Sequence, residues 1–197
     1  AKELKAAFRE LEQEIVAELP VYGEPELGKV FAGLFQKKGV DCNSQLIKNT
    51  AIVFRTISRQ KLKTYEGVID TLNNLRKNGK GVYLLSNAQS DFTRPELDML
   101  GLTPCFDGIL ISSEEGYKKP SPIFYHRLLE KFELHAANCL MVGNDESSDI
   151  AGAIAVGMDS LYIHTEISPQ EPVKKLATFN VLDGDWEKVS KILKSTM

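Results

Sequence analysis

The sequence predicts an α/β fold in which a Rossmann-like parallel sheet is joined to a small all-helical domain. Residues 1–60 show only the three- and four-residue apolar spacing of helices. From Leu62 onward, helical patterns alternate with short apolar runs that end at Gly, Asn or Asp, which is typical of βα units. We therefore expect a helical domain at residues 1–62 and an α/β core at residues 63–197.

The helical stretch divides into three segments. The first carries one apolar stripe, formed by Leu4, Phe8, Leu11, Ile15 and Leu19. A second stripe runs from Leu27 to Phe35 and ends at Gly39, a residue suited to the left-handed cap of a helix. The third helix is expected after Ser44. No part of this stretch has the pattern of a strand.

The core is predicted from five apolar runs, each short enough for a buried strand. These runs are Val82–Leu85, Gly108–Ile111, Cys139–Val142, Leu161–Ile163 and Phe179–Leu182. The helices expected around them are Glu66–Asn78, Arg94–Leu100, Pro120–Phe132, Ser148–Val156 and Asp185–Lys194. Strands that alternate with helices in this way favour a parallel sheet.

Composition excludes several classes of protein. Hydrophobic residues make up 43% of the chain and charged residues 26%, as in soluble globular domains. A net charge of -3 provides no basic field for nucleic acid, and no apolar run is long enough to span a membrane. The cysteines Cys42, Cys105 and Cys139 form no C-x-x-C pair, which favours a reducing, cytoplasmic location. The sequence favours neither a monomer nor a dimer.

Polar residues follow three of the predicted strands or the loops after them, where ligands bind in open α/β sheets. Ser86 and Asn87 could hold an anion with a hydroxyl and backbone N–H groups. Lys119 could deliver a point positive charge. Asp145 and Asp149 place two carboxylates where a strand turns into a helix, and hard oxygen ligands of this kind suit Mg²⁺.

Each of these features alone has a simpler interpretation. Ser86 and Asn87 could form an ordinary turn, Lys119 could lie in a solvated loop, and Asp149 could stabilise a helix N-terminus. A hydroxyl, a lysine and an acidic pair nevertheless occur in that order at the tips of successive βα units. The combination favours one shared site.

The segments around these residues resemble a known family. Leu84 to Ala88, Gly116 to Pro122 and Met141 to Asp145, followed by Asp149-Ile150, are similar to motifs two, three and four of the haloacid dehalogenase superfamily. The resemblance runs from about Tyr65 to Ile163, and the helical residues 1–60 are similar to the helical cap that such phosphatases insert after motif one.

The resemblance implies a Mg²⁺-dependent hydrolase of small phosphomonoesters that works through an aspartyl-phosphate intermediate. By motif, Ser86 and Asn87 would bind the phosphoryl oxygens and Lys119 would neutralise charge on the nucleophile and phosphate. The metal would be held by Asp145, Asp149 and Asn144. Asn144 stands where many relatives have Asp and brings no charge. The implied partner is a small phosphorylated metabolite.

Motif one, an apolar strand followed by Asp-x-Asp-x-Thr, does not occur in the chain. Because the cap follows motif one in this family, we expect the motif-one strand and its nucleophilic aspartate upstream of residue 1. The segment Asp183-Gly184-Asp185 follows an apolar run, but Glu187 stands where Thr is expected. We interpret it as a turn before the last helix.

Three other functions remain open from the sequence. A 2-haloacid dehalogenase of the same superfamily attacks carbon and needs no metal, and the acidic pair Asp145 and Asp149 argues against it. A sugar-phosphate mutase would keep the same motifs. A non-catalytic relative would bind a phosphorylated ligand or a protein and would lack the upstream aspartate.

Overall fold

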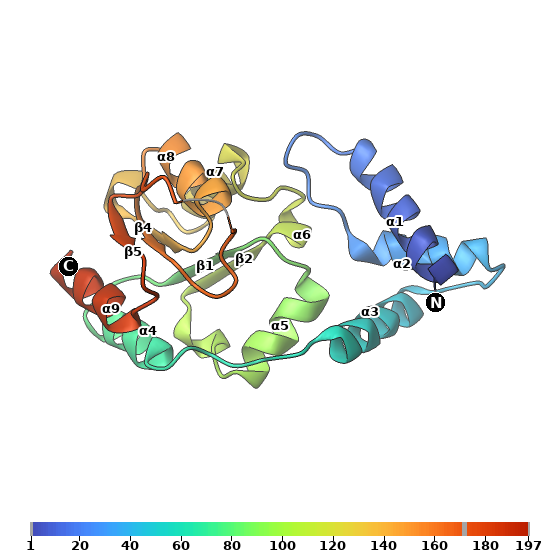
Figure 1. The fold of residues 1–197 in the computed structure, drawn as a ribbon, viewed down its shortest axis with the longest axis horizontal. Coiled ribbons are helices and arrows are strands. Elements are labelled where there is room, and N and C mark those ends of the chain that lie inside the picture. Colours follow the sequence, from blue (N-terminus) through green and yellow to red (C-terminus); the bar gives the residue numbers. More distant parts are fainter. Residues whose placement is uncertain (1, 171–172, 197) are drawn as a thin grey trace. The chain divides into compact units, whose positions relative to one another are not determined.

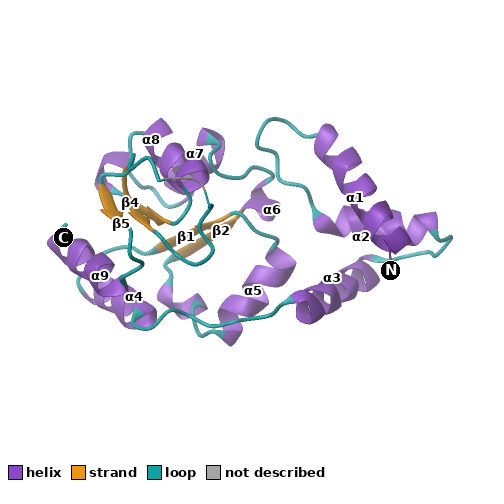
Figure 2. Cartoon of the chain, viewed as in Figure 1, coloured by secondary structure: helices purple, strands orange, loops and turns teal. Residues whose placement is uncertain are grey.

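The computed structural model describes residues 2–170 and 173–196, and it has the predicted α/β fold with a helical portion (Figures 1 and 2). The chain divides into two compact units: Ala1–Lys63, Asn87–Thr103 and Ile111–Lys118 form unit 1, and Thr64–Ser86, Pro104–Leu110 and Lys119–Met197 form unit 2. Unit 1 also contains two segments that lie beyond residue 62 in the sequence. The boundary between a cap at 1–62 and a core at 63–197 therefore stays a prediction. Within the described ranges, no helix is long and apolar enough to span a bilayer.

Unit 1 is helical. Its helices are α1 (Lys2–Ala17), α2 (Leu27–Lys37), α3 (Ser44–Ser58), α5 (Ser90–Met99) and α6 (Ser112–Glu115). Phe8 and Phe31, from the predicted stripes of α1 and α2, form an aromatic cluster with Phe54 of α3, in which the ring centroids lie 5.6–6.0 Å apart. Asn43 caps α3 by accepting a hydrogen bond from the Leu46 N–H. Phe8 and Phe31 therefore lie on packing surfaces of α1 and α2.

An ion pair joins α3 to α5 within unit 1. The Arg55 guanidinium donates to both carboxylate oxygens of Glu96, at 2.7 and 3.0 Å. Arg59 donates to the same carboxylate at 3.4 Å. Paired hydrogen bonds between a guanidinium and a carboxylate fix orientation as well as distance. This contact sets the position of α5 beside α3.

Unit 2 carries the strands, apart from the last residue of β2, which falls in unit 1. They are β1 (Tyr83–Ser86), β2 (Gly108–Ile111), β3 (Leu140–Gly143), β4 (Asp159–Ile163) and β5 (Phe179–Val181). Strand β1 pairs with β2, and β3, β4 and β5 form a second, parallel sheet in that order. Leu161 is paired with Val142 on one side and Phe179 on the other.

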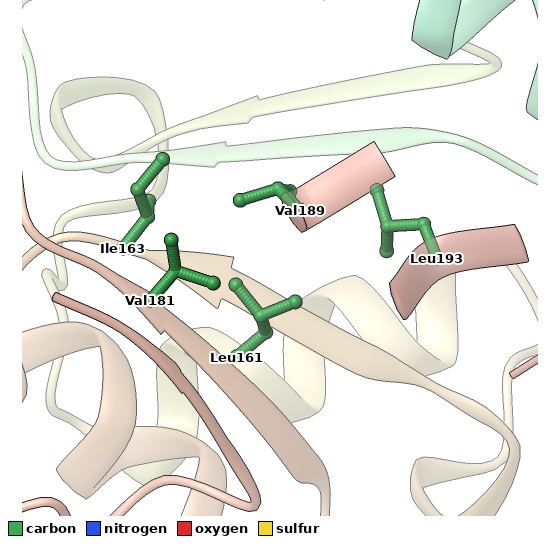
Figure 3. Packing of buried hydrophobic residues seen from close by; sticks show 5 residues of the cluster. All are labelled: Leu161, Ile163, Val181, Val189 and Leu193. Carbon is green, nitrogen blue, oxygen red and sulfur yellow. The ribbon is translucent and has the colours of Figure 1, made fainter. Parts of the chain in front are cut away.

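Helices cover both faces of the three-stranded sheet. The helices of unit 2 are α4 (Val68–Lys77), α7 (Pro122–Lys131), α8 (Ala151–Ala155) and α9 (Trp186–Ser195). Leu161 and Ile163 of β4 pack against Val189 of α9 (Figure 3), whereas Tyr162 between them packs against Ile150 on the opposite face. Successive side chains of a strand point to opposite faces, so an apolar run buried on both faces marks a central strand.

Two local features differ from the sequence-based expectation. The helix expected at Ser148–Val156 begins as a π-helix at Glu146–Ile150 and continues as α8. A π-turn inserts an extra residue into a helix and is frequent at functional sites. The short helix α6 was not expected, because four residues are too few to show a helical period.

Candidate active site

Lys119 and Asp149 form a buried ion pair in unit 2. The Lys119 Nζ lies 2.7 Å from Asp149 Oδ1 and donates to the Leu85 carbonyl at 2.8 Å. Only 10% of the lysine side chain and 6% of the aspartate side chain are exposed. A buried charge must be paired and hydrogen-bonded. The pair therefore fixes the ammonium group close to the end of β1, next to Ser86.

The second oxygen of Asp149 organises the loop after β3. Its Oδ2 accepts hydrogen bonds from the backbone N–H groups of Asn144 at 2.9 Å and Asp145 at 3.1 Å. One carboxylate thus binds the lysine on one side and two backbone donors on the other. Both oxygens are engaged, so the side chain is held in a single position.

Two glycines make room for this arrangement. A Cβ on Gly143 would overlap the Asp149 carboxyl group, because that group folds back over the end of β3. A Cβ on Gly152 would overlap the Tyr125 ring, whose hydroxyl donates to the Asp149 carbonyl at 2.7 Å. Burial raises the pKa of Tyr125, and the charges of Asp149 and Asp145 raise it further. Tyr125 therefore acts as a hydrogen-bond donor rather than an acid.

Asp145 caps the π-turn that follows. Its Oδ1 accepts from the Ser147 N–H at 2.8 Å and from the Ser147 hydroxyl at 2.7 Å. Burial acts to raise the pKa of Asp145, but hydrogen bonds from Ser147 and Ser148 outweigh it, so the pKa lies below its ordinary value. The carboxylate is therefore charged at neutral pH and adds negative charge beside Asn144.

The Asn144 carboxamide has a defined orientation. Its Nδ2 lies 3.3 Å from the Thr165 hydroxyl and 3.4 Å from the Ser168 hydroxyl. This leaves the Oδ1 as the atom of the side chain that can serve as an oxygen ligand. Across residues 2–170 and 173–196, no three His, Cys, Asp or Glu side chains gather as a metal site. The acidic pair and one neutral amide oxygen are what this loop offers to a cation.

The structure places most of the predicted residues in one neighbourhood. Ser86 is the half-buried last residue of β1, and the carbonyl of the preceding residue, Leu85, accepts a hydrogen bond from Lys119. Asn144, Asp145 and Asp149 are linked through their hydrogen bonds, and Asp149 connects them to the lysine. Asn87 belongs to unit 1. Their assignment to substrate and metal stays a prediction.

Sequence reasoning missed two groups in this neighbourhood, the Leu85 carbonyl and the Tyr125 hydroxyl. A backbone carbonyl leaves no mark in a sequence, and Tyr125 sits in the helical pattern like any other core residue. The interpretation of Asp183-Gly184-Asp185 as a turn is confirmed. Asp185 caps α9 through the Glu187 N–H at 2.9 Å, and Asp183 pairs with Lys188.

Curated relatives of the chain include several proteins named as phosphatases. The chain is 34% identical over 92 residues to a ribulose-1,5-bisphosphate 5-phosphatase of Halopiger xanaduensis, which covers 47% of this chain and 38% of that protein. It is 34% identical over 124 residues to a phosphoglycolate phosphatase of Yersinia pestis, covering 60% and 53%. The chain therefore spans about half the length of these relatives, or less.

Solved structures share the fold. A 2-haloacid dehalogenase from Pseudomonas syringae pv. tomato DC3000 superposes with a TM-score of 0.74 at 21% identity, covering 98% of this chain and 81% of that one. A predicted phosphoglycolate phosphatase from Haemophilus somnus 129pt gives a TM-score of 0.65 at 18% identity, covering 98% and 90%. At identities this low, the superpositions show a common fold and do not distinguish a phosphatase from a dehalogenase.

The family follows from a match over most of the sequence. The sequence model of the haloacid dehalogenase-like hydrolases matches residues 2–157, which include the helical segment, Ser86, Lys119 and the loop after β3. This match confirms the resemblance of the three motifs. The chain belongs to the haloacid dehalogenase-like hydrolase family.

Proposed function

We propose that the protein hydrolyses small phosphomonoesters and that Ser86, Asn87 and Lys119 bind the phosphoryl group. The observation that carries this proposal is the Lys119 ammonium, which Asp149 and the Leu85 carbonyl hold rigidly beside the end of β1. A fixed positive charge and a hydroxyl at the carboxyl ends of strands are suited to the charge that a phosphoryl group carries in its transition state.

The proposed reaction has two steps. An aspartate carboxylate attacks phosphorus and the bond to the leaving oxygen breaks, with the leaving group taking up a proton. Water then attacks the aspartyl-phosphate and releases inorganic phosphate. Lys119 would offset the negative charge that builds up in both steps, and Ser86 would donate a hydrogen bond to a phosphoryl oxygen.

We place the nucleophilic aspartate on a further strand, as the family resemblance implies. Two observations support this. Among the described residues, β1–β2 and β3–β4–β5 are separate sheets, so β1 and β3 are not hydrogen-bonded to each other. The Leu85 carbonyl, one residue before Ser86, and the Asn144 N–H after β3 are nevertheless linked through Lys119 and Asp149. A strand that pairs with β1 and β3 would present its last residue beside both.

We also propose that Mg²⁺ binds at the loop after β3. The Asn144 Oδ1 would be a ligand, because the Asn144 Nδ2 is engaged with the hydroxyls of Thr165 and Ser168. Asp145 and Asp149 would supply negative charge, Asp149 while it also holds Lys119. Bound Mg²⁺ would stabilise charge on the phosphoryl oxygens. Oxygen atoms from substrate, water and the nucleophile would complete the ligand set.

The substrate class follows the relatives, which include phosphatases named for ribulose-1,5-bisphosphate, phosphoglycolate and phosphoserine. We propose a small phosphorylated metabolite of this kind, turned over in the cytoplasm. The net charge of -3 argues against a nucleic acid as the partner.

The test measures phosphate release from p-nitrophenyl phosphate and phosphoglycolate by the full-length protein. Lys119→Met should abolish release, whereas Lys188→Met, which removes an exposed lysine on α9, should leave it unchanged. Chelation of Mg²⁺ should stop release and added Mg²⁺ should restore it. Halide release from 2-chloropropionate in chelator, with no phosphate release, would instead identify a dehalogenase and overturn the proposal.

A further inference from the structure

The carboxamide of Gln89 makes three hydrogen bonds to one loop of unit 1. Its Nε2 donates to Glu24 Oε1 at 2.9 Å and to the Pro25 carbonyl at 2.8 Å, and its Oε1 accepts from the Leu27 N–H at 2.9 Å. Two donors and one acceptor are used at once, which only an amide side chain can offer in this arrangement. Gln89 therefore binds the Glu24 side chain and two backbone groups, the Pro25 carbonyl before α2 and the Leu27 N–H at its start.

The same loop is tied to a second segment through its backbone. Gly23 and Tyr117 form an antiparallel bridge, in which Glu24 N–H donates to the Gly116 carbonyl at 3.1 Å and Lys118 N–H donates to the Tyr22 carbonyl at 2.9 Å. Tyr22 has a φ of 61°. A bulky residue in the left-handed region is strained and persists only where neighbouring contacts fix it. The bridge and the Gln89 bonds supply those contacts.

The partly buried position of Glu24 disfavours the charged form of its carboxylate. Its carboxylate is half-buried, and this burial raises its pKa, while Lys118, Ser112 and Gln89 act in the opposite direction. A surface loop could easily turn a carboxylate out to water. The polar groups that surround Glu24 instead retain it, so the loop conformation depends on them.

The segment that carries Gln89 is also anchored. The Ala88 N–H donates to the Ser112 hydroxyl at 2.8 Å, and the Ser90 N–H donates to the Ser113 hydroxyl at 2.9 Å. In the sequence, Ala88 to Ser90 directly follow Ser86-Asn87, and Lys118 directly precedes Lys119. The two segments that anchor the loop are thus continuous in the chain with the residues proposed to bind phosphate.

We propose that Gln89 is a positioning residue that couples the conformation of the loop Tyr22–Leu27 to that of residues 87–90, and through them to substrate affinity. The effect on substrate rests on the proposed phosphatase function. The coupling of the two segments does not, because it concerns contacts within unit 1 alone. Gln89 takes no part in bond making, so its loss should raise KM and leave kcat almost unchanged.

The experiment compares Gln89→Leu with Gln45→Leu in the full-length protein. Gln45 is an exposed residue of α3 with one side-chain hydrogen bond, to Asn49, so it controls for the exchange of an amide for an apolar side chain. Glu24→Gln serves as the conservative variant, since its amide oxygen can still accept the hydrogen bond from Gln89. Hydrogen exchange is followed for peptides that cover the loop, residues 87–93 and α9.

In Gln89→Leu, exchange should accelerate by at least about tenfold in the loop and in residues 87–93 but not in α9, because the loop amides lose their closing contacts. With p-nitrophenyl phosphate, KM should rise by about tenfold while kcat changes less than about threefold. Gln45→Leu and Glu24→Gln should behave like the unmodified protein.

Unchanged exchange in either segment would overturn the coupling, and so would acceleration in the loop alone. A fall in kcat at constant KM would overturn the positioning role. If the unmodified protein releases no phosphate, the proposed function fails, and the exchange measurements still decide whether Gln89 couples the two segments.

Discussion

The Lys119 ammonium and the Asp149 carboxylate lie 2.7 Å apart with nine-tenths of each side chain shielded from solvent. The aspartate also accepts two backbone hydrogen bonds from the loop after β3. Such a pair contributes little net stability when both members are present, but removal of one leaves a buried charge without its partner. The ion pair therefore couples the fold of unit 2 to the proposed phosphate site.

We predict that Asp149→Asn lowers the free energy of unfolding by about 3–5 kcal/mol, because the buried Lys119 ammonium loses the negative charge of Asp149. Urea unfolding measures this. The double variant Asp149→Asn with Lys119→Met should be more stable than Asp149→Asn alone, since the buried lysine charge is gone. A loss below about 1 kcal/mol, as for an exposed pair, would show that the contact is not buried in solution.

Gly143→Ala should disturb the same region without changing any charge. Its methyl group would overlap the Asp149 carboxyl group, so the carboxylate must move away from Lys119 and from the N–H groups of the loop. We expect a loss of about 1–3 kcal/mol of stability, measured by thermal or urea unfolding.

The control for this prediction is Gly28→Ala in α2. A Cβ there would meet only Ile47 at 3.4 Å, an ordinary contact, and alanine favours a helix. Gly28→Ala should be neutral or stabilising by up to about 1 kcal/mol. Equal losses in the two variants would contradict the steric explanation.

The acid stability of unit 1 should depend on Glu96. Hydrogen bonds from Arg55 lower the pKa of Glu96 below its ordinary value of 4.5, in spite of partial burial, and Arg59 adds to the effect. A lowered pKa in the folded state gives stability that is present above the unfolded pKa and is lost as pH falls through the folded pKa. The contribution is about 1 kcal/mol or less, because Arg55 is 41% exposed.

Glu96→Gln should therefore lower the free energy of unfolding at neutral pH. Below about pH 4.5, this free energy should fall less steeply with pH than in the unmodified protein. Unfolding free energies measured at intervals from neutral pH downward test this. Glu130→Gln, at an exposed position of α7, should keep the slope of the unmodified protein. An unchanged slope in Glu96→Gln would assign the acid sensitivity to other carboxylates.

Much of the fold follows from the sequence because its strands are short and mostly apolar. Leu161 and Ile163 face α9 while Tyr162 faces Ile150, so every position of this run is buried and the pattern cannot be taken for an exposed strand. The order of Ser86, Lys119 and Asp149 along the chain was informative for a similar reason. Parallel strands bring their carboxyl ends to one edge, so residues distant in sequence become neighbours.

Other features depend on contacts that no local pattern encodes. The fold-back of Asp149 over Gly143 requires β3, the π-turn and Lys119 to be in place together. The π-turn is closed by the Ile150 N–H, which donates to the Asp145 carbonyl at 3.3 Å, and the Asp145 side chain caps the same turn through Ser147. The two donors of Gln89 reach a loop more than 60 residues earlier in the chain, a separation at which sequence spacing carries no information.

Asn144 is the residue at which the proposed metal site differs from the acidic pattern that the family resemblance implies. We expect Asn144→Asp to bind Mg²⁺ about tenfold more tightly, because an anionic oxygen replaces a neutral one. The fold should be preserved, since the hydroxyls of Thr165 and Ser168 that accept from the amide can rotate and donate to a carboxylate.

The rise in Tm with Mg²⁺ concentration measures this affinity without reliance on catalysis. Asn49→Asp, at an exposed position of α3, adds the same charge away from the loop and should leave the Mg²⁺ dependence unchanged. Equal affinity in Asn144→Asp and the unmodified protein would mean that position 144 does not touch the metal. The negative charge of Asp145 and Asp149 would then act on a cation that other groups hold.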